Sequence, residues 1–324
     1  MLLTNRDIEL FSSNININFL SGKRILVTGG SGMVGSYLIE AILTGARNQG
    51  IQIEELVATS KSGNFTNILK LQKSFNLKLF KSNDMAEKDY CGFDYVIHAA
   101  SPSNFSKITT AAELEDVNSN ALNFILKGEP HALCYLSSGE VIGLRTLNTP
   151  SRELYPNAKI NAEKLALSFK DKISTSVNIA RLHHTFGPGV RKDDGRSFSD
   201  FIWSVANGEK PKLKSPGLQV RSFLYSLDAV LAILLVLSFA KKQFTFNLGS
   251  EAPISILKFA QQVSQIGNLG GQVEAMESPK GYVHSPYNEL VPDCSKLKEI
   301  GWKEVTPLSV AIEQTLSWAK RNTY

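Results

Sequence analysis

A glycine-rich stretch near the N-terminus constrains the fold of this chain most strongly. The apolar run 25–27 predicts a strand buried on both faces, and apolar residues then recur at helical spacing from 34 to 42. Glycines between strand and helix repeat in two overlapping registers, Gly29/Gly32/Gly35 and Gly30/Gly32/Gly35. Either register would bring backbone N–H groups at a helix N-terminus against a pyrophosphate. The order strand, turn, helix predicts a dinucleotide-binding unit, the alternative being a turn that needs small residues only for packing.

The length of 324 residues favours one large and one smaller lobe. We expect a dinucleotide-binding domain over 1–182, with 222–249 returning to it, and a mainly substrate-binding lobe over 183–324. Apolar residues make up 43% of the chain and charged residues 20%, which excludes a disordered chain. The net charge of +5 is spread along the sequence, so we expect no nucleic-acid partner.

Three cysteines, Cys91, Cys134 and Cys294, lie far apart and show neither metal-site nor disulfide spacing. This usage fits a reducing cytoplasm, and we expect no metal. The longest apolar stretch, 229–240, is too short to cross a bilayer and predicts a buried helix. No secretory segment is visible, so we expect a cytoplasmic protein without a membrane partner.

The second strand is predicted over 51–59, and in dinucleotide folds the residue that ends this strand meets the adenosine ribose. An acidic side chain there binds the 2′-hydroxyl, whereas a basic neighbourhood accommodates a 2′-phosphate. This sequence has Ser60 and Lys61 and no carboxylate. The cofactor is therefore NADP or NAD, with NADP favoured, although a solvated turn would show the same residues.

Further strands over 77–80, 95–101 and 132–136 alternate with helices, one of them expected over 118–126. This alternation predicts a Rossmann-type doubly wound parallel sheet. His98 lies in one of these runs and is expected to be a packed core histidine. Beyond residue 182, glycines and prolines break the pattern, which predicts a smaller C-terminal α/β lobe for the substrate.

Tyr155 and Lys159 are four residues apart and would share one face of a helix. An ammonium there would favour the phenolate and lower the phenol's pKa, which would give a base usable near neutrality. Ser138, at the end of a strand, could share the substrate's proton. The pair alone is a common pattern and carries little weight.

In this order the residues resemble the extended short-chain dehydrogenase/reductase family, in its nucleotide-sugar epimerase/dehydratase branch. The resemblance runs nearly end to end. Its motifs lie at 28–35, 84–85, 98–101, 137–143, 155 with 159, 181–188, 247–250, 292–296 and 301–302. The stretch 185–198 is most similar to UDP-glucuronate decarboxylases and the related 4,6-dehydratases.

The resemblance implies a nucleotide-sugar substrate and a role for each matched residue. The pyrophosphate would lie on the glycine turn, adenine on Asp84-Met85, and nicotinamide along 99–101. Tyr155 would take a proton from a sugar C4 hydroxyl, Lys159 would hold the ribose and Ser138 would orient the hydroxyl. The cofactor contacts would be Gly29, Ser31, Gly32, Met33, Val34, Gly35, Ser60, Lys61, Asp84, Met85, Ala99, Ala100, Ser101, Tyr155 and Lys159.

The same resemblance places the nucleotide diphosphate near Arg191, Arg196 and Arg221, whose guanidinium groups fit phosphate in bidentate fashion. Surface solvation is the alternative for these arginines. His184 falls in the substrate site, where relatives usually carry asparagine. We also expect a homodimer.

Glu140 lies where dehydratases and decarboxylases keep a glutamate beside the sugar ring. Strand alternation would turn Ser138 and Glu140 to the same face, and a shielded carboxylate there would have a raised pKa and could exchange a proton with C5. A glutamate that caps the next turn or pairs with an arginine is the alternative. Gly139 stands where 4,6-dehydratases carry an aspartic acid, and the segment from Ser138 to Tyr155 is short.

We therefore expect NAD(P)-dependent oxidoreductive modification of a nucleotide-linked sugar through a 4-keto intermediate, of the epimerase, dehydratase or decarboxylase type. One alternative is an NADPH-dependent 4-keto-sugar reductase, which needs only Ser138, Tyr155 and Lys159. Another is a non-catalytic NAD(P)-binding relative that has lost its substrate site.

Overall fold

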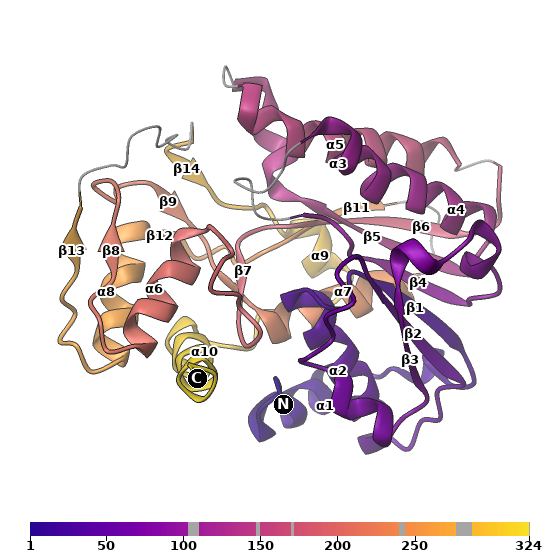
Figure 1. Cartoon of the computed structure of the whole chain (residues 1–324), viewed down its shortest axis with the longest axis horizontal. Coiled ribbons are helices and arrows are strands. Elements are labelled where there is room, and N and C mark those ends of the chain that lie inside the picture. Colours follow the sequence, from indigo (N-terminus) through magenta and orange to yellow (C-terminus); the bar gives the residue numbers. More distant parts are fainter. Residues whose placement is uncertain (103–109, 147–149, 170–171, 240–243, 277–286, 324) are drawn as a thin grey trace.

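A seven-stranded parallel sheet forms the centre of the structure (Figure 1). The computed structural model describes residues 1–102, 110–146, 150–169, 172–239, 244–276 and 287–323. The strands run in the order β11-β6-β5-β4-β1-β2-β3, and every pairing is parallel. They are β1 (Arg24–Thr28), β2 (Glu55–Ser60), β3 (Leu77–Lys81), β4 (Tyr95–His98), β5 (Ala132–Ser138), β6 (Ser176–Leu182) and β11 (Phe244–Leu248). This order is that of a doubly wound dinucleotide-binding sheet, which confirms the predicted fold class.

Helices cover both faces of this sheet (Figure 1). One face carries α1 (Asn5–Asn14), α2 (Met33–Asn48) and α7 (Ser226–Ser238), and the other carries α3 (Ala111–Glu115), α4 (Ala121–Lys127) and α5 (Pro150–Ser168). A π-helical turn, Asp116–Asn120, joins α3 to α4. Because both faces are covered, β1, β2, β4 and β5 are buried along nearly their whole length.

Three helices, α6 (Ser197–Ala206), α8 (Ile256–Ile266) and α10 (Leu308–Arg321), pack together beside the sheet (Figure 1). Stacked Phe223 and Phe259, with ring centroids 4.0 Å apart, anchor their aromatic core. The small elements here are β7 (Thr185–Phe186), β8 (Lys212–Leu213), β9 (Val220–Arg221), β10 (Leu224–Tyr225), β12 (Ile254–Ser255), β13 (Glu274–Ala275), β14 (Glu289–Leu290) and α9 (Ser295–Glu299). In the sequence between β10 and β12, α7 and β11 return the chain to the large sheet.

Three predicted elements have different bounds in the structure. The strand expected over 51–59 is β2, which begins at Glu55, because Ile51 still donates its N–H to Ala46 O of the preceding helix end. The helix expected over 118–126 is a π-helical turn followed by α4. The buried helix expected over 229–240 is α7, which ends at Ser238; residue 240 lies outside the described residues.

The carboxyl ends of β1, β4 and β5 meet at one edge of the sheet. Thr28 pairs with His98, and His98 pairs with Tyr135, so the turns after these strands lie side by side. The order of the strands reverses between β1 and β4, which is where ligands bind in open α/β sheets. The site is therefore expected at this edge.

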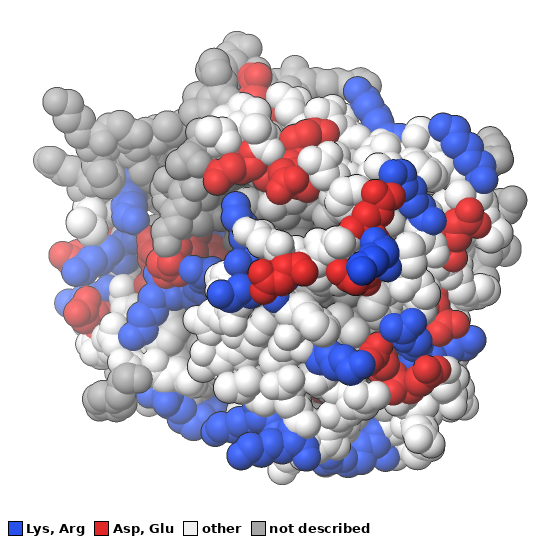
Figure 2. All heavy atoms as spheres, turned by 45° about the vertical axis from the view of Figure 1, so that its right-hand side comes forward, with Lys and Arg blue, Asp and Glu red and all other residues white. Residues whose placement is uncertain are grey.

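Acidic and basic side chains are interspersed over much of the surface that Figure 2 shows, and Lys and Arg gather along the lower rim of that view. On this face, charges of both signs are mixed except along that rim.

Candidate active site

The glycine turn packs against neighbouring backbone so closely that it excludes side chains. Gly29 has a φ of +70°, and a Cβ there would lie 2.7 Å from both Ala100 N and Ala99 O. A Cβ at Gly35 would collide with Gly29 O, so the first turn of α2 rests directly on the turn after β1. Gly32 is the N-cap of α2 and provides no side-chain cap, which leaves the amide groups of the first turn to face an anion.

Hydroxyl groups gather where β2 ends beside this turn. Ser60 Oγ lies 2.5 Å from Ser31 Oγ and 3.1 Å from Ser62 Oγ. Lys61 forms a half-exposed ion pair with Glu113, with 3.6 Å between Nζ and Oε1. The end of β2 thus presents hydroxyls and an ammonium that a surface carboxylate partly neutralises.

His98, at the end of β4, is fully buried beneath the site. Its Nδ1 lies 2.7 Å from Thr28 Oγ1, and its ring stacks on Tyr135 with 5.6 Å between centroids. Burial lowers the pKa of His98 to about 3, and nearby Lys159 adds to the effect, so the ring is neutral at physiological pH. The same Thr28 hydroxyl accepts the Ala100 N–H at 3.2 Å and holds the small-residue turn after β4.

Ser138, Tyr155 and Lys159 come together at the carboxyl end of β5. A hydrogen bond links the Tyr155 hydroxyl with Ser138. Lys159 is 2% exposed; its Nζ donates to Leu136 O at 2.8 Å and lies 5.9 Å from the centroid of the Tyr155 ring. One helix and one strand end therefore assemble the hydroxyl pair and the ammonium.

The electrostatics of this group differ from the sequence-based expectation. Burial raises the pKa of Tyr155, while the Ser138 hydrogen bond and the charge of Arg196 work in the opposite direction. Burial also lowers the pKa of Lys159 to about 7. The lowering of the phenol's pKa that the sequence predicts is not found, because desolvation is the largest effect on Tyr155 and raises its pKa.

A buried network supports this group from behind. Glu163 accepts a 2.5 Å hydrogen bond from Ser137 Oγ and pairs with Arg181 through two bonds of 2.9 and 2.6 Å. Bidentate geometry of this kind fixes both side chains. The end of β5 is therefore tied to α5 and β6 next to the reacting groups.

Glu140 faces the same space as Ser138, but not by strand alternation. β5 ends at Ser138, and Gly139 begins a 3₁₀-helix that runs to Thr146, so the alternation argument was wrong. The Glu140 N–H instead donates to Ser138 Oγ at 3.2 Å.

A cavity of about 430 Å³ connects these groups. Most of the predicted cofactor residues line this cavity, together with all four predicted catalytic residues and three of the four predicted substrate residues. Those lining it are Gly29, Ser31, Gly32, Met33, Val34, Gly35, Ser60, Lys61, Ala99, Ala100, Ser101, Ser138, Glu140, Tyr155, Lys159, His184, Arg191 and Arg196.

Three predicted residues do not line this cavity. Asp84 instead borders a second, open hollow of about 500 Å³, and Met85 packs against the core on the α4 side of the sheet. Arg221 is buried, and its guanidinium donates to the carbonyls of Val220, at 2.6 Å, and Tyr287, at 3.0 Å.

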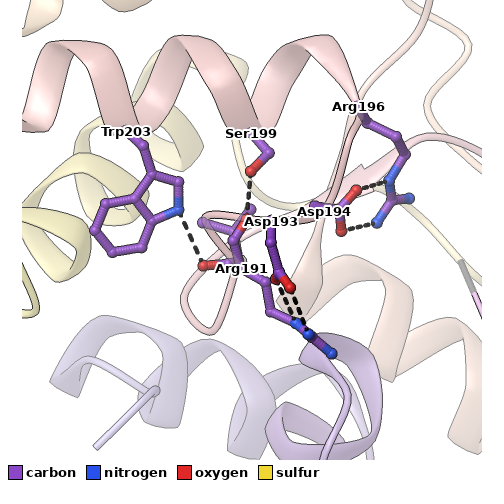
Figure 3. Close-up of polar contacts among 7 residues, drawn as sticks. Arg191, Asp193, Asp194, Arg196, Ser199 and Trp203 are labelled. Atoms are coloured by element: carbon purple, nitrogen blue, oxygen red, sulfur yellow. Dashed lines mark hydrogen bonds and ion pairs between the residues drawn. The ribbon is translucent and has the colours of Figure 1, made fainter. Parts of the chain in front are cut away.

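The two arginines that do line the cavity are paired within their own loop (Figure 3). Arg191 binds Asp193 through two 2.9 Å bonds, and Arg196 binds Asp194 in the same bidentate manner. Ser199 Oγ donates to Arg191 O at 2.5 Å, and the Trp203 indole donates to Val190 O at 3.3 Å. The loop before α6 is therefore fixed at both ends, and each guanidinium already has a counter-charge.

His183 also lines the cavity, and sequence reasoning missed it. The signal that could have found it is a glycine after each neighbouring strand, Gly139 and Gly249, which leaves space for a ring.

Other features bear on the expected partners. Among the described residues, no group of three His, Cys, Asp or Glu side chains could hold a metal ion. In the same part of the chain, no helix combines the length and apolar character needed to cross a bilayer. Cys91 is exposed, Cys134 and Cys294 are buried, and all three are free.

Comparison with known sequences gives a consistent result. The chain is 27% identical to UDP-glucuronic acid decarboxylase 1 of Xenopus tropicalis, over 94% of this chain and 75% of that protein. It is 25% identical to dTDP-D-glucose 4,6-dehydratase of Bos taurus, over 93% and 89%.

Solved structures share the fold at lower identity. UDP-N-acetylglucosamine 4-epimerase from Methanobrevibacter ruminantium, in complex with UDP-N-acetylmuramic acid, superposes with a TM-score of 0.79 at 20% identity, covering 93% of this chain and 99% of that one. UDP-glucuronic acid 4-epimerase from Bacillus cereus, with UDP-glucuronic acid and NAD, gives 0.77 at 19%, covering 92% and 99%. The NAD dependent epimerase/dehydratase family matches residues 25–249. The chain belongs to this family of enzymes.

Proposed function

We propose that this chain oxidises the C4 hydroxyl of a nucleotide-linked sugar with a bound nicotinamide cofactor, and then acts on the carbons next to the new ketone. The observation that carries this proposal is the cavity that joins the glycine turn to Ser138, Tyr155 and Lys159. The sequence relatives are enzymes named for UDP-glucuronic acid and dTDP-glucose, which supports a sugar nucleotide as the substrate class.

The residues present fit a dinucleotide. The backbone after β1 lies so close to that after β4 that a Cβ at Gly29 has no room, and the uncapped first turn of α2 faces the cavity. The pyrophosphate would lie on this turn, and the ribose next to Ser60. When bound, the nicotinamide would accept the two electrons that leave the sugar carbon.

Tyr155 and Ser138 are placed to move the proton. Ser138 holds the substrate hydroxyl against the Tyr155 oxygen, to which it is already hydrogen bonded. The positive charge of Arg196 favours the phenolate. Burial raises the pKa of Tyr155, so its phenol must lose its own proton before it can take the proton of the C4 hydroxyl. Once it has taken that proton, the Tyr155 phenol is the donor for the reverse step.

Glu140 extends the chemistry beyond simple oxidation. A ketone at C4 acidifies the C5–H bond and weakens the bond to a C6 carboxylate, because the electrons released are delocalised into the carbonyl. Glu140 lines the same cavity as Tyr155, so a carboxylate is available to exchange that proton. This placement favours an epimerase-, dehydratase- or decarboxylase-type reaction over a plain reduction at C4.

The test compares Tyr155→Phe with Tyr90→Phe. Tyr90 is buried and does not line the cavity, so its variant controls for the loss of a hydroxyl. NAD-loaded protein is mixed with UDP-glucuronic acid or dTDP-glucose, and the nicotinamide absorbance is followed. We expect Tyr155→Phe to lower the rate by a factor on the order of 10² without weakening NAD binding, and Tyr90→Phe to leave the rate unchanged. A near-normal rate in Tyr155→Phe would refute the proposal.

A further inference from the structure

His183 occupies a slot that two glycines create. It follows β6 directly, and its N–H donates to Leu248 O at 2.9 Å, while Thr185 Oγ1 donates to its carbonyl at 2.9 Å. A Cβ at Gly139 would lie 2.5 Å from its Nδ1 and Cε1, and a Cβ at Gly249 would lie 3.0 Å from its Cβ. The His183 ring therefore occupies the space that a side chain at position 139 would need.

The His183 imidazole is 5% exposed and borders the cavity. Neither ring nitrogen has a hydrogen-bond partner of good geometry among the described residues, although the Asn247 amide lies close enough to raise the pKa. Buried polar groups normally find a partner, so two open nitrogens at the wall of a substrate cavity indicate a ligand that supplies the missing bonds.

The charge state of this ring narrows the chemistry of that ligand. Burial lowers the pKa of His183 to about 4; the Asn247 amide opposes this effect and the Arg181 charge adds to it. A neutral imidazole has one N–H donor and one acceptor nitrogen, which point in different directions, so one ligand group pairs with only one of them. A hydroxyl both donates and accepts and can pair with either nitrogen, whereas a phosphate or a carboxylate can pair only with the N–H.

We propose that His183 binds a hydroxyl group of the substrate's sugar, beside the carbon held by Ser138 and Tyr155, and so selects which sugar is accepted. This inference rests on the proposed function and deepens it, because it assigns a specificity-determining contact to a residue of this chain. The contact involves the sugar alone, so the nucleotide part of the ligand does not depend on it.

Calorimetry on NAD-loaded protein can isolate the sugar contact. Affinities for UDP-glucose and UDP, and for dTDP-glucose and dTDP, are measured for the wild type and for His183→Phe, which keeps the ring's volume. His131→Phe is the matched control, since His131 is exposed and does not line the cavity. We expect His183→Phe to reduce the preference for sugar nucleotide over bare nucleotide by about tenfold, because a buried hydroxyl loses its partner. The affinity for UDP or dTDP alone, and the control variant, should stay unchanged.

Each outcome decides between the proposals. A folded His183→Phe variant that keeps the full preference for sugar would overturn the His183 contact while leaving the proposed function intact. A wild type that shows no preference for either sugar nucleotide over its bare nucleotide would overturn both. Where the variant fails to fold, ¹⁵N spectra of wild-type histidines provide the answer. We expect the His183 ring nitrogens to shift more with UDP-glucose than with UDP, and equal shifts would refute the contact.

Discussion

Replacing Lys159 with methionine should change how stability depends on pH. Burial holds the pKa of Lys159 at about 7, whereas the ordinary value is 10.5. Between these values the unfolded chain keeps the proton that the folded protein has lost, so the free energy of unfolding rises with pH. The proton-linkage relation, integrated from pH 7 to pH 9, gives a gain of about 2 kcal/mol from this group alone. Methionine has a similar volume and no charge, so Lys159→Met should lack that gain.

The assay is urea unfolding of both proteins at pH 7 and pH 9, under reducing conditions because Cys91 is exposed. Groups other than Lys159 titrate in both proteins. Their contributions therefore cancel when the pH-dependent change in the free energy of unfolding of the variant is subtracted from that of the wild type. We expect the wild type to gain about 2 kcal/mol relative to Lys159→Met over this range. Equal changes in the two proteins would refute the reasoning, since they would mean that Lys159 keeps its ordinary pKa despite being 2% exposed.

Further predictions concern the cofactor and Glu140. Gly35→Ala should abolish the fluorescence change on NADH binding, because the added Cβ collides with Gly29 O; retained binding would show that the turn can relax. We propose that the hydroxyls around Ser60 and the Lys61 ammonium accept a 2′-phosphate, so NADPH should bind more tightly than NADH in a fluorescence titration, and the reverse order would contradict this. In deuterium oxide, Glu140→Gln should still oxidise C4 but incorporate less deuterium at C5 than the wild type; equal incorporation would make Glu140 a structural residue.

Local sequence patterns predicted the sheet and the glycine turn well. The apolar run 25–27 and the glycines after it sufficed, because a buried parallel strand and a close backbone contact each restrict residue types narrowly. Tyr155 and Lys159 were found through helical spacing, and the structure confirms that both line one cavity. These features depend on neighbours in sequence.

Features that depend on residues far apart in the sequence were missed or were predicted wrongly. Strand alternation could not predict the position of Glu140, because a 3₁₀-helix begins at Gly139. The low pKa of Lys159 follows from the layers packed over it and not from Tyr155. Arg221 matched the family's pattern, but its guanidinium binds backbone carbonyls that lie 66 residues away in sequence or directly before it. His183 depends on glycines after two other strands, which no window along the chain brings together.

The paired arginines of the loop before α6 affect how an anionic ligand would enter. Arg191 and Arg196 each pair with the carboxylate of an aspartate two residues away in the same loop, so their charges are balanced before a ligand binds. A diphosphate arriving there would exchange one anionic partner for another and would release few counter-ions from solution. Ionic strength weakens the bonds broken and the bonds made alike. The affinity for UDP should therefore change less with added salt than it would at a site with uncompensated arginines.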